Sequence, residues 1–393
     1  MDTITHGIAG ALLAKAVFNG ADLFPPEPFD KRRVITWSLT LGAIFPDSDV
    51  LRDFLSSDPM LIITWHRSIT HSLLCLPIWT VLLAALTLAT CRWRKCDSPS
   101  YLSLCGLWAA GILSHIFLDL VTSFGTMIWS PLQWSRPAWD LIFIIDFTFS
   151  ALLLCPQILA WVYRQAAGLK NRAIITWCVL ALASLGVAAL AKNVGAPISE
   201  QTAVAILALL AVLFLLPALG GKGLRVRYAT WNRAGLAAAI LYLAAAFYAH
   251  HAAFERVQKF ASLFRLPAES LGALPLPPSV WHWDGLVNTP HGVYEVRLDL
   301  SERLDLASVE HRYYPDAPSN QYIETAKGLP EVQKVLWFSR FPVTRFHKEG
   351  NVAIVEFFDV RFSSIRRDRP ASFTYRVKMD EDGQVIAKGW ERE

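Results

Sequence analysis

Three short motifs in the first third of the chain carry side chains of the types that bind metal ions. They are Phe45-Pro46-Asp47-Ser48-Asp49, His66-Arg67-Ser68-Ile69-Thr70-His71-Ser72 and Ser114-His115-Ile116-Phe117-Leu118-Asp119. Carboxylates and imidazoles are ligands for hard or borderline divalent cations. Here they stand among apolar residues, where an unpaired charge is expensive and usually marks a working site. The pattern therefore indicates a site in which a bound cation offsets the burial of these groups.

His115 and Asp119 are four residues apart in an apolar stretch that predicts a helix. Residues at this spacing lie on one helical face with their Cβ atoms about 5–6 Å apart. The imidazole and the carboxylate could therefore hold one cation together. The alternative is a simple His–Asp hydrogen bond inside a helix bundle, because ionisable residues in membrane segments often pair with one another.

Asp47 and Asp49 follow Pro46, which ends the preceding helix and fixes a rigid bend. Two acids separated by one residue could point into the same cavity or bridge two ions. Either of them could also accept a proton during a reaction. The alternative is that they cap a helix that starts near Val50, since Asp and Ser are favoured at helix N-caps.

His66 and His71 are five residues apart, so they do not share one helical face. If a helix starts at Ser68, His66 lies in the preceding loop and His71 in the first turn. Arg67 would then lie at the membrane surface, where its guanidinium suits an anionic oxygen. The alternative is a set of interfacial polar residues at the start of a helix.

His6, near the start of the first apolar stretch, is a further candidate. Taken together, these acids and imidazoles predict a metal site, because such a cluster has few other physical explanations. Zinc suits a mixture of His and Asp, with about one to three ions, and manganese, iron and magnesium are the alternatives. The expected ligands are His6, Asp47, Asp49, His66, His71, His115 and Asp119.

The composition predicts that these motifs lie in a multi-pass membrane protein. The chain has 393 residues, of which 53% are hydrophobic and 18% charged, which is too apolar for an ordinary soluble domain. Six apolar runs approach the roughly 20 residues of a spanning helix. These runs are residues 72–90, 101–121, 141–163, 173–191, 201–221 and 234–253. Two shorter stretches, residues 4–18 and 34–45, are expected to pack against the bundle or to dip partly into it.

Basic residues alternate along the loops between these runs. Successive loops hold three, one, three, one and four Lys or Arg residues. Because basic loops favour the cytoplasm, the alternation places all candidate ligands near the outer face of the membrane, together with everything after residue 254. The net charge of +4 is too small to suggest nucleic acid as a partner.

The composition changes at the end of the last apolar run. Residues 253–264 predict an amphipathic helix, and four prolines between 267 and 278 predict a stiff linker. Residues 294–300, 352–362 and 373–379 alternate apolar and polar side chains, which is typical of half-buried strands. One helix is expected within residues 322–338. The tail is therefore expected to be a small domain of roughly 110 residues, β-rich or α+β.

The ordered motifs resemble the YdjM-like family of bacterial membrane-bound metal-dependent hydrolases. The resemblance rests on Thr5-His6, on the three motifs above, on the extension of the third motif to Gly125, and on Ser130-Pro131, and covers about residues 1–165. This family is distantly similar to zinc-dependent phospholipase C and P1 nuclease, whose zinc ions are held by His and Asp.

The resemblance implies ligand roles for particular residues. His115 and Asp119 would correspond to the ligands of a His-x-x-x-Asp helix. They would be joined by His66 or His71 and by one of the two acids of the Pro46 corner. The soluble enzymes use an amino-terminal amine as a ligand, and the His6 side chain would have to take its place here.

We therefore expect a multi-pass α-helical membrane bundle, with a helical core like that of phospholipase C and P1 nuclease, and a C-terminal soluble domain. The expected divisions are a hydrolase-like membrane domain (1–165), additional transmembrane helices (166–253), an amphipathic helix with a Pro-rich linker (254–280) and an extracytoplasmic β-rich domain (281–393). In the bacterial inner membrane, with lipids as partners, such a protein would hydrolyse a phosphoester of a lipid or envelope component. Asp47, Asp49 and Arg67 would assist the reaction.

The alternative is a metal-binding membrane protein without catalysis, with a structural, sensing or transport role. A transporter would place charged residues near the middle of the membrane, and Asp146 is the strongest such example in the apolar runs. An intramembrane metalloprotease is disfavoured, because the sequence contains no His-Glu-x-x-His motif.

Overall fold

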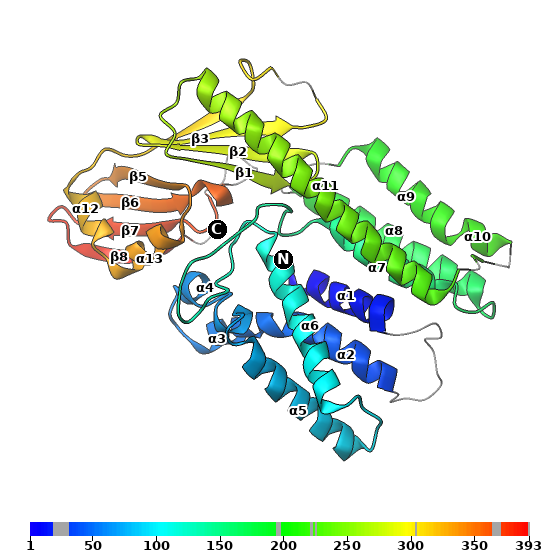
Figure 1. The fold of residues 1–393 in the computed structure, drawn as a ribbon. Coiled ribbons are helices and arrows are strands. Elements are labelled where there is room, and N and C mark those ends of the chain that lie inside the picture. The colour runs from blue at the N-terminus through cyan, green and yellow to red at the C-terminus, as the bar shows by residue number, and fades with distance from the viewer. Residues whose placement is uncertain are drawn as a thin grey trace.

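The computed structural model describes residues 1–18, 31–193, 198–220, 223–224, 226–302, 305–363 and 371–391. Helices fill the first two thirds of the chain and two β-sheets follow them, at one end of the helical part (Figure 1). Two of the basic loop residues counted above, Lys222 and Arg225, lie outside the described residues.

The helical part contains α1 to α11. Their bounds are α1 Thr3–Leu13, α2 Lys31–Ile44, α3 Leu51–Leu55, α4 Leu61–Thr64, α5 Leu76–Arg94, α6 Tyr101–Leu120, α7 Phe147–Val162, α8 Leu169–Asn193, α9 Glu200–Phe214, α10 Leu216–Leu219 and α11 Tyr228–Leu263. A π-helical turn, Ala14–Phe18, extends α1, and 3-10 turns form at Phe45–Val50 and Ile69–His71.

Five helices of the described residues are long and apolar enough to cross a membrane, where the sequence predicts six. They are Leu76–Arg94, Tyr101–Leu120, Leu169–Lys192, Glu200–Leu219 and Tyr228–Leu263. The remaining run, 141–163, yields the shorter α7, because the Asp146 side chain accepts a hydrogen bond from the Phe149 amide and caps the helix there. Tyr242 and Ser279 also donate to Asp146, so this acid makes a polar contact at the end of α7.

The two short N-terminal stretches form α1 and α2, and α1 lies between α2 and α7 (Figure 1). The backbones of α2 and α6 approach closely, since a Cβ atom on Gly111 would lie 2.8 Å from the Leu39 carbonyl oxygen. Small residues allow such close helix packing in membrane proteins. His115 follows Gly111 by one turn of α6, so this crossing fixes the His115 side chain against the end of α2.

Each sheet has four antiparallel strands in sequential order. The first contains β1 Ser270–Leu276, β2 His282–Thr289, β3 Gly292–Asp299 and β4 His311–Pro315; the second contains β5 Pro342–Glu349, β6 Val352–Asp359, β7 Tyr375–Met379 and β8 Val385–Trp390. In the sequence, α12 Gln321–Lys327 and α13 Pro330–Phe338 come between the two sheets. Both helices contact β6 of the second sheet. The single helix expected within 322–338 is therefore two helices, because a turn at Gly328-Leu329 and the N-terminal Pro330 of α13 separate them.

The segment 254–280 differs from its prediction. Helix α11 continues without a break to Leu263, and Pro275 lies in β1, which is an edge strand and therefore tolerates proline. Val257 of α11 packs with the fully buried Trp283 in the core under the first sheet. The part of the chain that forms the sheets therefore begins at β1 and packs against the last turns of α11.

The second sheet is attached to the helical part near the motifs. A hydrophobic core joins Met60, Ile63 and Phe124 to Val335 and Phe338 of α13. The loop between α6 and α7 is thus held between the helices and the second sheet.

Candidate metal centre

The predicted ligands converge at the end of the helical part that faces the sheets. His6 comes from the first turns of α1 and Asp47 from the 3-10 turn after α2, while His71 ends the 3-10 turn before α5. His115 and Asp119 come from the last turns of α6. Elements that are far apart in the sequence therefore each contribute one or two side chains.

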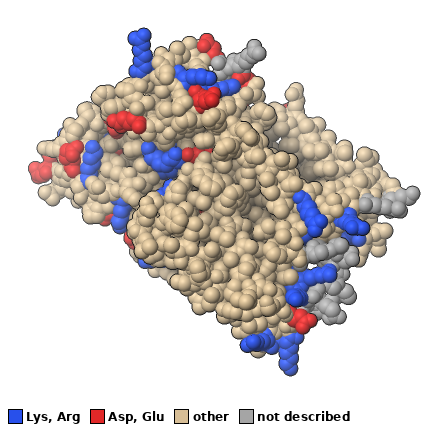
Figure 2. Space-filling model, viewed as in Figure 1, with Lys and Arg blue, Asp and Glu red and all other residues tan. Residues whose placement is uncertain are grey.

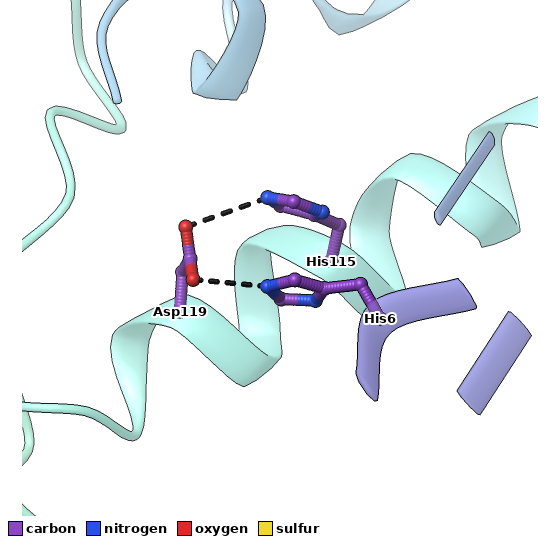
Figure 3. Close-up of side chains that lie close together, drawn as sticks. All are labelled: His6, His115 and Asp119. Atoms are coloured by element: carbon purple, nitrogen blue, oxygen red, sulfur yellow. Dashed lines mark hydrogen bonds and ion pairs between the residues drawn. The ribbon is translucent and has the colours of Figure 1, made fainter. Parts of the chain in front are cut away.

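Asp119 is the centre of this cluster. Its Oδ1 lies 3.1 Å from His6 Nε2, and its Oδ2 lies 3.2 Å from His71 Nε2 and 3.4 Å from His115 Nε2. Figure 3 shows the Asp119 carboxylate facing both His6 and His115, whose rings are stacked with centroids 3.6 Å apart. All four side chains are 0% exposed.

Asp47 approaches the same imidazoles from the other side. Its Oδ1 lies 3.5 Å from His115 Nε2 and 3.9 Å from His71 Nε2, while Thr3 donates to its Oδ2 at 2.6 Å. Two groups of three residues thus have their ligand atoms within 4.8 Å of one another: His6, His115 and Asp119, and Asp47, His71 and His115. His115 belongs to both groups, so they form one continuous centre.

The hydrogen bonds of His115 fix which nitrogen faces the cluster. Its Nδ1 lies 2.7 Å from the Ala43 carbonyl oxygen, which only accepts, so Nδ1 carries the proton. Nε2 is therefore the nitrogen that faces His71 Nε2, 3.0 Å away, and the carboxylates. A backbone carbonyl on the far nitrogen of an imidazole is a common way to orient a metal ligand.

The chemistry of these groups fits a divalent cation. Burial lowers the pKa of His71 to about 4, against the opposing effect of Asp119, so its imidazole is neutral at pH 7. His6 Nδ1 and Asp119 Oδ2 are buried without a hydrogen-bond partner. Unpaired buried polar atoms are expensive, and a cation held by nitrogen and oxygen ligands would stabilise this arrangement. His6, Asp47, His71, His115 and Asp119 are the residues placed to hold it.

Asp49 and His66 lie one step outside this set. Asp49 accepts hydrogen bonds from the Arg67 amide at 2.9 Å and from Thr70 at 3.3 Å, and His66 Nδ1 lies 3.0 Å from it. Its Oδ2 is 3.5 Å from His71 Nδ1, on the far side of that ring from the cluster. Asp49 therefore orients His71, and neither Asp47 nor Asp49 caps α3, which has no side-chain cap.

Arg67 is buried inside the site, where the sequence predicted a surface position. It is 2% exposed, and its Nη2 lies 3.0 Å from Asp119 Oδ1. Its backbone has φ +62°, which is uncommon for a residue with a Cβ atom and indicates local strain. Hydrogen bonds from the Arg67 amide to Asp49 and from the Met127 amide to the Arg67 carbonyl hold this conformation.

Two neighbours of the centre were missed by sequence reasoning. The Met1 amino group is buried and forms an ion pair with Asp119. The His6 side chain, which was expected to take the place of such an amine, contacts the same carboxylate beside it. The Phe124 ring lies 5.8 Å from His66 and 4.9 Å from the Arg67 guanidinium, and Phe338 of α13 packs on it at 5.2 Å. No residue type or spacing marks either contact, because both arise from folding of distant segments.

Comparison with known proteins places this centre in a family. Residues 1–195 match the sequence model of the family described as YdjM inner membrane protein. The match extends past residue 165 and contains all seven predicted ligands. No curated protein and no solved structure matches the chain, and a similarity to phospholipase C or P1 nuclease is not shown. Residues 1–195 therefore belong to the YdjM inner membrane protein family.

Proposed function

We propose that this protein is a membrane-embedded metal-dependent hydrolase that cleaves a phosphoester of a lipid or envelope component. The observation that carries the proposal is the convergence of three imidazoles and two carboxylates, with His71 Nε2 and His115 Nε2 only 3.0 Å apart. Zinc suits this mixture of ligands, and manganese, iron and magnesium are the alternatives.

A divalent cation in this centre would supply hydroxide near neutral pH, because it lowers the pKa of bound water to about 7. Asp47 is the cluster carboxylate best placed to accept a proton, since its side chain is 10% exposed and its Oδ1 faces the imidazoles. Asp49 is already bonded to His66, Arg67 and Thr70, so its role is to position His71.

Arg67 is suited to bind an anionic oxygen of the substrate. Its guanidinium lies beside Asp119 and Thr122, and its Nε atom is buried without a hydrogen-bond partner. A planar guanidinium binds phosphate oxygens well. This arrangement favours a phosphoester over an uncharged ester.

The position of the centre supports a lipid-derived substrate. It lies at the end of apolar helices, where a headgroup can be reached without removing the lipid from the bilayer. Basic side chains gather at the other end of the helices, in the last turn of α5 and at the start of α2. Because basic ends favour the cytoplasm, we place the centre and the sheets on the extracytoplasmic side.

The test is the metal content and the activity of the detergent-purified full-length protein. We expect the unmodified protein to retain a divalent metal by elemental analysis and to release phosphate or a phosphorylated headgroup from a panel of phospholipids. Asp119→Asn and His115→Gln should lose both properties. His251→Gln is the matched control, since this exposed histidine lies on α11 outside the cluster.

Two outcomes would count against the proposal. Full metal content in both Asp119→Asn and His115→Gln would show that the bound metal does not occupy the proposed centre. Metal that is retained by the unmodified protein without turnover of any phosphoester would favour a structural or sensing role instead.

A further inference from the structure

The loop between α6 and α7, residues 121–146, has an outer surface without exposed charge. Its charged residues are Arg136, Asp140 and Asp146; the two acids are buried and the arginine is half-buried. Arg136 donates hydrogen bonds to two backbone carbonyl oxygens, and Asp146 caps α7. Asp140 forms an ion pair with Arg340. Charged side chains are mostly exposed in proteins, so a long loop that exposes none of them to water is unusual.

Large apolar side chains occupy this surface instead. Trp129, Leu132 and Trp134, here called the apolar tip, are 43%, 83% and 43% exposed. They lie on a turn in which the Leu132 amide donates to the Trp129 carbonyl oxygen at 3.0 Å. The Thr126 amide donates to the Pro137 carbonyl oxygen at 3.1 Å and joins the two arms that lead to the turn. The loop therefore presents its apolar tip away from the core, as a surface that binds a membrane or a partner would.

The apolar tip is fastened to the start of α5. The Ser72 hydroxyl donates to the Ser130 carbonyl oxygen, and the Leu73 amide donates to the Ile128 carbonyl oxygen at 2.9 Å. Ser72 and Leu73 come just before α5, which is one of the helices long and apolar enough to cross a membrane. Because such a helix ends at the level of the lipid headgroups, the apolar tip lies at that level.

The base of the loop continues the apolar surface of a second candidate span, α6. The Trp139 ring packs on the Phe117 ring of α6 with centroids 5.8 Å apart, and Trp139 is itself 45% exposed. Phe117 and Leu113, one turn earlier, are exposed on α6. On the face shown in Figure 2, a broad area of the helical part carries no charged side chain, as contact with lipid requires. The exposed face of α6 therefore extends into the loop without an intervening charge.

We propose that the apolar tip and Trp139 insert into the headgroup region of the leaflet at this end of the helices and bind phospholipid there. Indole rings suit this region because they combine an apolar body with a polar N–H group. Leu132 contacts the first acyl carbons. Because the surface has no exposed charge, the contact does not select lipids by headgroup charge.

This contact also places the candidate metal centre relative to the membrane. The Met127 amide, in the arm that leads to the apolar tip, donates to the Arg67 carbonyl oxygen at 2.9 Å. Insertion of the tip therefore holds Arg67 close to the lipid surface. The proposal concerns lipid contact alone and does not depend on the hydrolase activity.

The test is photolabelling of the full-length protein in phosphatidylcholine vesicles that contain a phospholipid with a diazirine on its acyl chain near the glycerol. Mass spectrometry of the peptides identifies the labelled segments. We expect residues 129–139 to be labelled, like the candidate span α8, and to the same extent when phosphatidylglycerol is added. The internal reference is Ile386 of β8, an apolar side chain that is 58% exposed on the second sheet and should stay unlabelled.

Leu132→Glu should lower the labelling of residues 129–139 several-fold, because it places a charge at the apolar tip. The labelling of α8 should not change, which shows that the variant is folded and inserted. Ile386→Glu is the matched control, since it introduces the same charge at an exposed apolar position and should leave the labelling of residues 129–139 unchanged.

Three outcomes would overturn the proposal. Labelling of residues 129–139 no stronger than that of β8 would mean that the apolar tip lies in water. Equal labelling in Leu132→Glu and the unmodified protein would mean that the tip does not make the lipid contact. Labelling that falls when the protein is concentrated in the vesicles and returns on dilution with lipid would assign the tip to a contact between copies of this chain.

Discussion

At the scale of single residues, the centre depends on side chains that orient the ligands. The Ala43 carbonyl orients the His115 ring through Nδ1, and Asp49 lies 3.5 Å from Nδ1 of the His71 ring. Asp49 does this work from outside the cluster, since its hydrogen bonds go to the Arg67 amide, Thr70 and His66. Ligands and positioning residues can therefore be separated by mutation.

Asp49→Asn tests this separation. We expect metal affinity to fall about 10- to 100-fold, the usual effect of removing a group that orients a ligand, while stoichiometric binding remains at high metal concentration. Competition with a fluorescent chelator measures the affinity. Asp119→Asn is the comparison and should abolish binding. Loss of binding in both variants at every metal concentration would make Asp49 a ligand in its own right.

A second residue-scale feature lies in the first sheet, far from the centre. Burial raises the pKa of Asp284 to about 8, with Glu295 acting in the same direction and Arg297 opposing them. The folded state therefore binds a proton on Asp284 that the unfolded chain releases above about pH 4. Stability of the sheet domain should fall as the pH rises from about 4 to 8.

This slope can be measured by hydrogen exchange of β2 and β3 between pH 5 and pH 9, corrected for the intrinsic exchange rate. It should not exceed about 1.4 kcal/mol per pH unit, the linkage of one proton, and Asp284→Asn should flatten it. Asp299→Asn is the control. Burial acts to raise the pKa of Asp299, but hydrogen bonds from Ser301 lower it. This acid therefore does not bind an extra proton in the folded state, and its substitution should leave the slope unchanged. An unchanged slope in Asp284→Asn would assign the pH dependence to another group.

At the scale of elements, the crossing of α2 and α6 positions the centre. Gly111 lets the α6 backbone approach the Leu39 carbonyl, and His115 follows one turn later. A side chain at this crossing would push α6 away from α2. The His115 hydrogen bond to Ala43 would then lengthen.

Gly111→Ala should therefore destabilise the protein by about 1–3 kcal/mol, as overpacked interiors do, and weaken metal binding without changing any ligand. Thermal unfolding in detergent and metal titration measure the two effects. Gly106→Ala on the same helix is the matched control, because a Cβ atom there meets nothing within 4 Å. Equal behaviour of the two variants would show that the crossing tolerates a side chain.

At the scale of the whole molecule, the sheet domain and the membrane helices are joined at the loop between α6 and α7. Arg340 binds Asp140 with two hydrogen bonds, at 2.9 and 2.8 Å, and Arg361 donates to the Ser123 carbonyl at 2.8 Å. Phe124 packs on Phe338 of α13 and on Phe362, which lies in the 3-10 turn after β6, beside the centre. The second sheet thus stabilises the loop that covers the candidate site.

Arg340→Gln should loosen this junction. Because Arg340 is partly exposed, we expect a cost of roughly 1 kcal/mol and faster hydrogen exchange in residues 121–146. Lys388→Gln is the matched control, since it breaks the Lys388–Glu331 pair within the sheet domain. Exchange that rises equally in both variants would contradict a specific role for the Arg340–Asp140 pair.

The apolar helices, the alternation of the strands and the residue types of the centre could be predicted from local sequence patterns. These features are local, because a spanning helix needs one continuous apolar run and a half-buried strand imposes a period of two. The sequence also predicted that the motifs would meet at one end of the helices, from the alternation of basic loops. Five of the seven expected ligands, His6, Asp47, His71, His115 and Asp119, lie together in the structure.

The division of these residues into ligands and positioning groups depends on their arrangement in space. Asp49 and His66 have the same residue types as the ligands. In the folded chain, however, Asp49 lies on the Nδ1 side of the His71 ring, away from the cluster, and His66 contacts Asp49. Burial of Arg67, the Met1 amine at Asp119 and the aromatic cover from α13 depend on contacts between segments more than a hundred residues apart or on a strained backbone. A sequence pattern cannot carry such information, because it records neighbours along the chain and not neighbours in space.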